Sequence, residues 1–150
     1  MLKKLKDNRR GSIMVELALT VPLVFILCMG ATDFARLFYH ALTIKGASSG
    51  AALLGAQDPL LSGGNPGMQA RATSDADNLA GVTATPTQVC QCPNAAPFSC
   101  QDYAATTCAG YGAPRAYVRV QVNQDFQTLG YYPGIPSQTN IREASWMRVQ

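Results

Sequence analysis

The sequence predicts an α+β protein: a long N-terminal helix that begins in a membrane, then a small head of one short helix and about three antiparallel strands. Three observations support this fold. Residues 17–32 (LALTVPLVFILCMGAT) form an uncharged apolar run directly after a basic flank. Residues 115–122 (RAYVRVQV) alternate apolar and polar side chains, as a half-buried strand does. Four cysteines lie close together between residues 90 and 108, in a segment that contains turn-forming residues.

The apolar run has the length and the flanks of a membrane span. From Ser12 to Thr32 the only acidic or basic side chain is Glu16, and these residues make about 31 Å of helix, close to the thickness of a bilayer's hydrocarbon core. Five cations against Asp7 place +4 in the first ten residues, so the rest of the chain carries −1 of the total +3. A basic flank marks the cytoplasmic side of a span. The folded part has no net basic charge, which argues against nucleic-acid binding.

The chain divides into three parts. Residues 1–11 are a basic leader that ends at a glycine, residues 12–56 a transmembrane and stalk helix, and residues 57–150 an exported α+β head. As one helix, residues 12–56 would be about 67 Å long, more than twice the hydrocarbon core. The stalk is amphipathic, and its apolar stripe is predicted to pack on another element in water. That stripe consists of Phe34, Leu37, Phe38, Ala41 and Ile44, opposite the polar Asp33, Arg36, His40 and Thr43.

Small residues crowd the end of the stalk. The stretch GASSGAALLGA (46–56) contains Gly46 and Gly50 at a spacing that lets another backbone approach closely. Two interpretations stay open, a packed helical neighbour and a frayed helix end.

The head is predicted from local patterns. Residues 58–67 (DPLLSGGNPG) are a turn-rich linker, and a short helix follows with Asn65 as its N-cap and Pro66 at its first position. Its apolar side consists of Met68, Ala72, Ala76 and Leu79. The strands are expected at residues 82–89, 115–122 and 140–149, with Pro86 favouring an edge position for the first.

Cys90, Cys92, Cys100 and Cys108 are predicted to form two disulfides. Their spacings lack the C-x₂₋₄-C pairs of most structural zinc sites, and an exported head lies in an oxidising compartment. A bond between Cys90 and Cys92 would be strained, which leaves two pairings open: 90–100 with 92–108, or 90–108 with 92–100. Cys28 lies within the apolar run and is predicted to be an inert packing residue.

Catalysis has little support in the sequence. The chain has one histidine, His40, on the polar side of a helix, and such a residue is more often solvated or packed than catalytic. Asp75 and Asp77 fall on a polar helix face, where solvation is a simpler interpretation than metal binding. There is no glycine-rich phosphate loop and no credible Ser/His/Asp set. We therefore predict no catalytic residue, no metal and no cofactor.

The N-terminal motif resembles that of type IV pilin-like precursors. A basic leader, Gly11, four uncharged residues, Glu16 and then an apolar helix is their arrangement, and in them a membrane aspartyl peptidase cuts after the glycine. Residues 9–56 (RRGSIMVELALTVPLVFILCMGATDFARLFYHALTIKGASSGAALLGA) resemble more narrowly the TadE-like family, minor pilin-like proteins of tight-adherence (Flp) pilus systems. Leu17 stands where such precursors usually carry Phe or Tyr.

The resemblance implies a non-enzymatic subunit for pilus assembly, placed in the bacterial inner membrane with its N-terminus in the cytoplasm and its head in the periplasm. It implies leader cleavage between Gly11 and Ser12. The implied partners are other pilin-like subunits, the inner-membrane assembly platform, a prepilin-type leader peptidase and membrane lipid.

Cleavage would give Glu16 a role. It frees an α-amino group on Ser12, which is normally protonated near neutral pH. A lone carboxylate in lipid costs a few kcal/mol at mid-bilayer and less near the interface, and pairing Glu16 with the Ser12 ammonium of a neighbouring subunit would lower that cost. The alternative is an uncut single-pass anchor, with Glu16 at the headgroups and an exported head that binds a surface or ligand. The mature N-terminus separates the two.

Overall fold

The computed structural model describes residues 9–57, 66–101 and 106–149 of the 150-residue chain. The elements are helices α1 (Arg9–Gln57) and α2 (Pro66–Asp75) and strands β1 (Thr83–Gln91), β2 (Phe98–Ser99), β3 (Arg115–Gln127) and β4 (Gln138–Arg148). They confirm the predicted α+β fold, with a long apolar helix, a second short helix and an antiparallel sheet. The sheet has four strands instead of about three, because β2 was not predicted.

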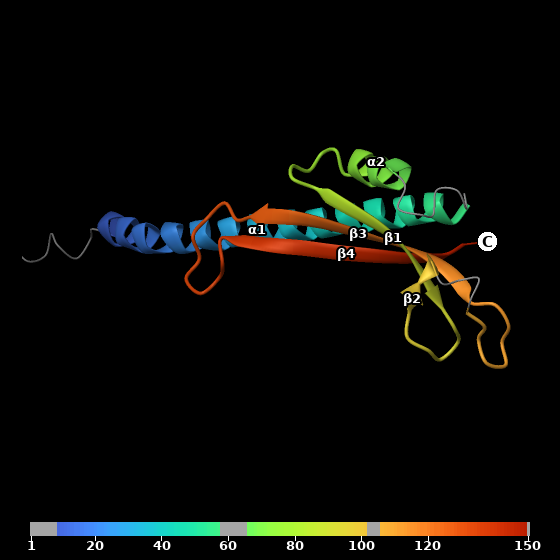
Figure 1. The fold of residues 1–150 in the computed structure, drawn as a ribbon. Coiled ribbons are helices and arrows are strands. Elements are labelled where there is room, and N and C mark those ends of the chain that lie inside the picture. The colour runs from blue at the N-terminus through green and yellow to red at the C-terminus, as the bar shows by residue number, and fades with distance from the viewer. Residues whose placement is uncertain (1–8, 58–65, 102–105, 150) are drawn as a thin grey trace, which may run out of the picture.

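Helix α1 is one continuous helix of 49 residues. It begins at Arg9, three residues before the predicted start, and it runs through Gly11 and Pro22. A glycine inside a helix costs about 1 kcal/mol relative to alanine but does not by itself end the helix, so the helix continues through the glycine that was predicted to separate the leader from it. Figure 1 shows the C-terminal half of α1 lying along the sheet, while its N-terminal half projects beyond the head. Residues 1–8 of the predicted leader lie outside the described residues.

The sheet has the order β2-β1-β3-β4, and all its neighbouring strands are antiparallel. Strand β3 is central, and its Val120 lies between Pro86 of β1 and Ser145 of β4. The even-numbered residues of β3 face α1, and Val118, Val120 and Val122 are fully buried there. The predicted alternation thus continues beyond residue 122, because β4 pairs with β3 as far as Gln127. On the side away from β3, strand β1 pairs with β2 only at Val89 and Cys90, near the end of β1. Pro86 precedes this pairing and therefore lies on an edge of the sheet, as expected.

The core lies where α1 packs on both α2 and the sheet. It contains Ile44 of α1 and Met68 of α2, both fully buried, together with the three valines of β3. Ala72 is buried as well, which confirms the predicted apolar side of the second helix for Met68 and Ala72; Ala76 and Leu79 are also buried but follow the helix, which ends at Asp75. The predicted N-cap, Asn65, and most of the 58–67 linker lie outside the described residues.

The small residues at the end of α1 admit close neighbours. A Cβ added to Gly50 would lie 2.8 Å from the Asp75 Oδ2 of α2, and one added to Gly55 would lie 3.1 Å from the Val118 Cγ1 of β3. A Cβ at Gly46 would meet no atom within 4 Å. Of the two interpretations the packed neighbour is therefore correct, but the neighbours are α2 and β3 of the same chain, and Gly46 takes no part.

Candidate functional site: the membrane helix and its junction with the head

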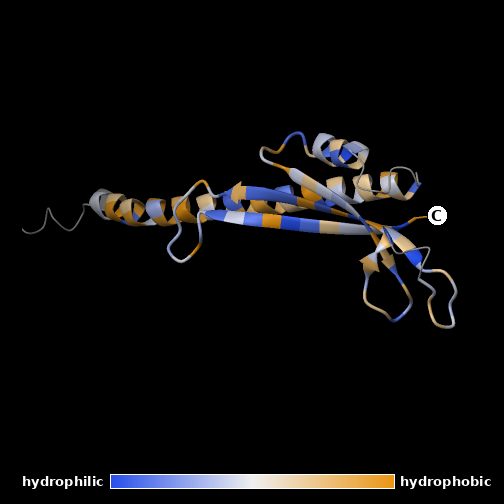
Figure 2. Cartoon of the chain, viewed as in Figure 1, coloured by the Kyte–Doolittle hydropathy of each residue, from blue (hydrophilic) through white to orange (hydrophobic). Residues whose placement is uncertain are grey.

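The N-terminal part of α1 is a bare apolar helix. Residues 11–28 are all exposed, and Figure 2 shows this mostly hydrophobic segment extending beyond the head. The helix is long and apolar enough to cross a membrane, and none of its most apolar stretch is buried within the chain. Because a helix that is apolar all round is stable only where lipid or other helices surround it, this segment is a candidate membrane anchor.

Glu16 is exposed on this segment, one helical turn after Ser12 and on the same side of the helix. Among the described residues its carboxylate has no hydrogen-bond or ion-pair partner. The headgroup region or a group from another molecule could compensate this charge. Cleavage between Gly11 and Ser12, and the pairing of Glu16 with a second subunit, stay predictions.

Beyond the span, α1 exposes a second apolar surface. Phe34, Phe38 and Leu42 follow one another at one-turn spacing and are 70%, 59% and 57% exposed. The prediction that the stripe containing Phe34 and Phe38 would pack on the head was wrong for these two residues. Asp33 and His40, which the sequence places on the polar side opposite that stripe, face the head, because partners there satisfy their polar atoms. We call Phe34, Phe38 and Leu42 the stalk stripe.

Asp33 joins α1 to the loop between β3 and β4 (residues 128–137, here the hairpin loop). Its carboxylate is buried, and its Oδ2 accepts hydrogen bonds from the backbone N–H of Leu129 at 3.0 Å and from the Tyr132 hydroxyl at 3.0 Å. The backbone N–H of Gly130 donates a longer bond at 3.4 Å. Arg36, one turn further along α1, forms an ion pair with Oδ1 at 3.0 Å. Asp33 thus fixes the hairpin loop against the helix.

These contacts keep Asp33 ionised. Burial raises the pKa of Asp33, but the four groups that donate hydrogen bonds to it favour the carboxylate, so its pKa lies below the ordinary value of 3.8. Burial and the neighbouring negative charge raise the pKa of Tyr132, which stays a neutral hydrogen-bond donor. A carboxylate with this many donors and a low pKa is poorly suited to proton transfer near neutral pH. Its role is structural.

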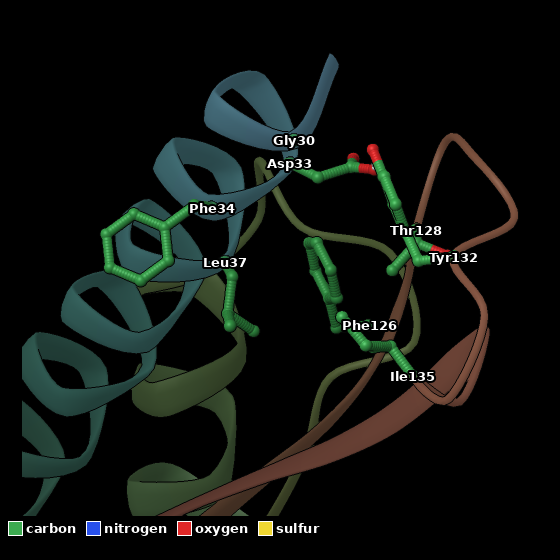
Figure 3. A pocket seen from close by; sticks show the side chains of 8 residues that line it. All are labelled: Gly30, Asp33, Phe34, Leu37, Phe126, Thr128, Tyr132 and Ile135. Carbon is green, nitrogen blue, oxygen red and sulfur yellow. Dashed lines mark hydrogen bonds between the residues drawn. The ribbon is translucent and has the colours of Figure 1, made fainter. Parts of the chain in front are cut away.

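A pocket of about 240 Å³ opens beside this junction. Figure 3 shows Asp33 pointing from α1 towards Tyr132, with Leu37 and Phe126 flanking the space between helix and loop. The pocket is lined by Gly30, Asp33, Phe34, Leu37, Phe126, Thr128, Tyr132 and Ile135. Its lining is mostly apolar, and its Asp33 carboxylate and Tyr132 hydroxyl are already bonded to each other, so the geometry supports contact with an apolar group.

We expect Asp33→Asn to lower the melting temperature of the full chain in detergent micelles at pH 7, because the amide keeps one acceptor oxygen and loses the charge. A group with a lowered pKa contributes stability that is complete above its unfolded pKa and is lost as pH falls through its folded pKa. The difference between parent and variant should therefore shrink below about pH 4. Asp77→Asn, at an exposed site, is the control. A difference that is equal at pH 7 and pH 3 would contradict this role.

The sequence did not single out Asp33 as a junction residue. The available signal was its position, since it is the first charged residue after the uncharged run of residues 17–32. A carboxylate at the edge of an apolar span needs donors. The donors lie 96 to 99 residues away in the hairpin loop, and no local pattern connects them to Asp33.

His40 is half-buried between α1 and the C-terminal part of β3. Its Nδ1 lies 3.0 Å from the Gln124 Oε1, and its ring meets Phe126 edge-on with a centroid separation of 5.2 Å. The Gln124 amide in turn donates to the backbone carbonyl of Ala80. The histidine therefore connects helix, sheet and the segment after α2 as a structural residue.

The four clustered cysteines form two disulfides, Cys90–Cys100 and Cys92–Cys108, with Cα–Cα distances of 5.0 and 5.5 Å. This selects one of the two pairings that the sequence left open. The first bridge adjoins the pairing of Cys90 with Phe98, and so holds the two-residue β2 against the end of β1. A strand this short has no periodicity to detect, which explains why it was missed. Cys28 carries a free thiol on the exposed face of α1.

Comparison with known proteins bears on the helix. A family model described as TadE-like protein matches residues 11–53, which covers α1 from Gly11 almost to its end. A search of curated proteins and a search of solved structures give no significant match. The match falls on the segment whose motif carried the resemblance, and it confirms that residues 11–53 are similar to TadE-like proteins.

Proposed function

We propose that the chain is a non-enzymatic, pilin-like membrane subunit that takes part in assembly of a tight-adherence (Flp-type) pilus. The observation that carries the proposal is the uncovered apolar surface of α1. It includes the bare segment at residues 11–28 and continues past the span as the stalk stripe. Lipid can cover the first part. The second part extends into water, where an apolar surface of this kind favours packing against another helix.

The same proposal places the helix in the bacterial inner membrane, crossing it once. The basic residues of the leader support a cytoplasmic N-terminus. Two disulfides support a head in the periplasm, since such bonds persist in oxidising compartments. The proposed partners are other pilin-like subunits, the inner-membrane assembly platform and, for cleavage after Gly11, the leader peptidase. Glu16 is proposed to pair with Ser12 of a neighbouring subunit.

Two measurements test this function. Intact mass of membrane-purified protein should place the mature N-terminus at Ser12. A photo-crosslinking phenylalanine analogue at Phe38 should give crosslinks to pilin-like subunits in cells. The same analogue at Gln69, which is exposed on the polar side of α2, should not.

Each outcome has a distinct meaning. A mass that includes the leader contradicts cleavage but leaves the membrane anchor in place. A full-length mass together with an absence of crosslinks from Phe38 would favour the alternative, an uncut anchored protein whose exported head binds a surface or ligand.

A further inference from the structure

The hairpin loop reaches back along α1 to the edge of the apolar span. A Cβ added to Gly130 would lie 3.3 Å from the Met29 Cε, and the Asp33 carboxylate accepts bonds from the loop backbone. Figure 1 shows the loop between β3 and β4 beside α1, at the level where the helix leaves the head. Its position along the helix axis is therefore fixed by contacts with residues 29–33.

The loop has the composition of a surface that meets lipid. Its ten residues, TLGYYPGIPS, include no charged side chain. Tyr131 is 86% exposed, Leu129 64% and Ile135 58%. Three large apolar or aromatic side chains exposed together on one uncharged loop are uncommon on a surface that faces only water.

The depth of the hairpin loop relative to the bilayer indicates what its exposed side chains contact. With residues 12–32 in the hydrocarbon core, Met29 lies about 5 Å inside the outer boundary and Asp33 about 2 Å outside it, at 1.5 Å per residue. The hairpin loop therefore lies at the membrane–water interface, where tyrosine is enriched because its ring is apolar and its hydroxyl is polar. At this depth the apolar surface of the loop lies next to the apolar surface of the bare helix.

We propose that the hairpin loop is a membrane-contact element whose exposed side chains Leu129, Tyr131 and Ile135 enter the interface of the leaflet on the head side. Together with α1 it makes a second contact with the bilayer, displaced sideways from the helix. Two contacts restrict the rotation and tilt of the head relative to the membrane. The proposal rests on the membrane placement of α1, which is part of the proposed function, and is independent of leader cleavage and of the pilus.

Fluorescence quenching by brominated lipid tests the loop directly. The chain has one tryptophan, Trp146, which Trp146→Phe removes. In that background Tyr131→Trp places a reporter in the loop, Tyr111→Trp one in the disulfide-bonded region, and Phe25→Trp one within the span. Each full-length chain is reconstituted in phosphatidylcholine–phosphatidylglycerol vesicles with and without bromine on the acyl chains. Aqueous iodide is the second quencher.

The expected result is several-fold more quenching by brominated lipid for Tyr131→Trp than for Tyr111→Trp, with the order reversed for iodide. Quenching of Tyr131→Trp by iodide alone would overturn the proposal and place the loop in water. Resistance to both quenchers would also overturn it, in favour of burial against a second subunit. The Phe25→Trp reporter tests the membrane placement of α1 separately from the loop. If brominated lipid does not quench this reporter, the membrane placement of α1 itself fails.

Discussion

Glu16→Gln should abolish assembly while leaving membrane insertion and leader processing intact. Removing a charge makes the span easier to insert, and the family resemblance implies that the peptidase reads mainly the glycine. Assembly should fail because the Ser12 ammonium of the neighbouring subunit loses its counter-charge, and an unpaired charge in a dry helix bundle costs more than the pair contributed. Pilus counts should fall to those of cells without the protein, and crosslinks from Phe38 should disappear.

Glu143→Gln is the matched control, since it removes the chain's only other glutamate. That residue forms a half-exposed ion pair with Lys45 at 3.5 Å on the head, and loss of such a pair changes stability by at most about 1 kcal/mol. Its pilus counts should be normal. Normal counts and crosslinks in a stably expressed Glu16→Gln variant would make Glu16 a bystander and favour the uncut anchored protein.

The second large effect is expected from removal of the disulfides. We expect the double variants Cys90→Ser/Cys100→Ser and Cys92→Ser/Cys108→Ser each to lower the free energy of unfolding of the head by about 2–5 kcal/mol. The bridge between Cys92 and Cys108 closes the longer loop, 16 residues apart against 10, so chain entropy predicts the larger loss there. Denaturant unfolding of the detergent-solubilised chain, followed by Trp146 fluorescence, measures both.

Thiol counting tests the pairing itself. Each matched double variant keeps one bridge, so alkylation of the denatured, unreduced protein should label Cys28 alone. The mismatched variant Cys90→Ser/Cys108→Ser breaks both bridges, and should show additional labelling and lower stability than either matched variant. Labelling of all four clustered cysteines in the parent protein would contradict the disulfides and revive the zinc or reduced state.

Several features followed from the sequence because they depend on local composition or periodicity. The bare helix follows from a run of uncharged residues, and the strand at 115–122 from alternation between two faces. The buried side of α2 follows from apolar residues one turn apart, of which Met68 and Ala72 are fully buried. The presence of two disulfides followed from cysteine count and spacing. Each of these inferences needed only neighbours along the chain.

Only the tertiary structure decided which face of the stalk is covered. The sequence shows two faces there, an apolar stripe and a polar side, and the covered face contains Asp33 and His40. The partners of these two residues lie 84 to 99 residues away, in β3 and the hairpin loop. The disulfide pairing and the short β2 depend likewise on where a loop folds back on β1. Such contacts arise from strand register and loop closure, which depend on the whole packed chain. The sequence therefore determined that α1 is an apolar helix long enough to cross a membrane, whereas packing determined that its outer half leaves the stalk stripe uncovered.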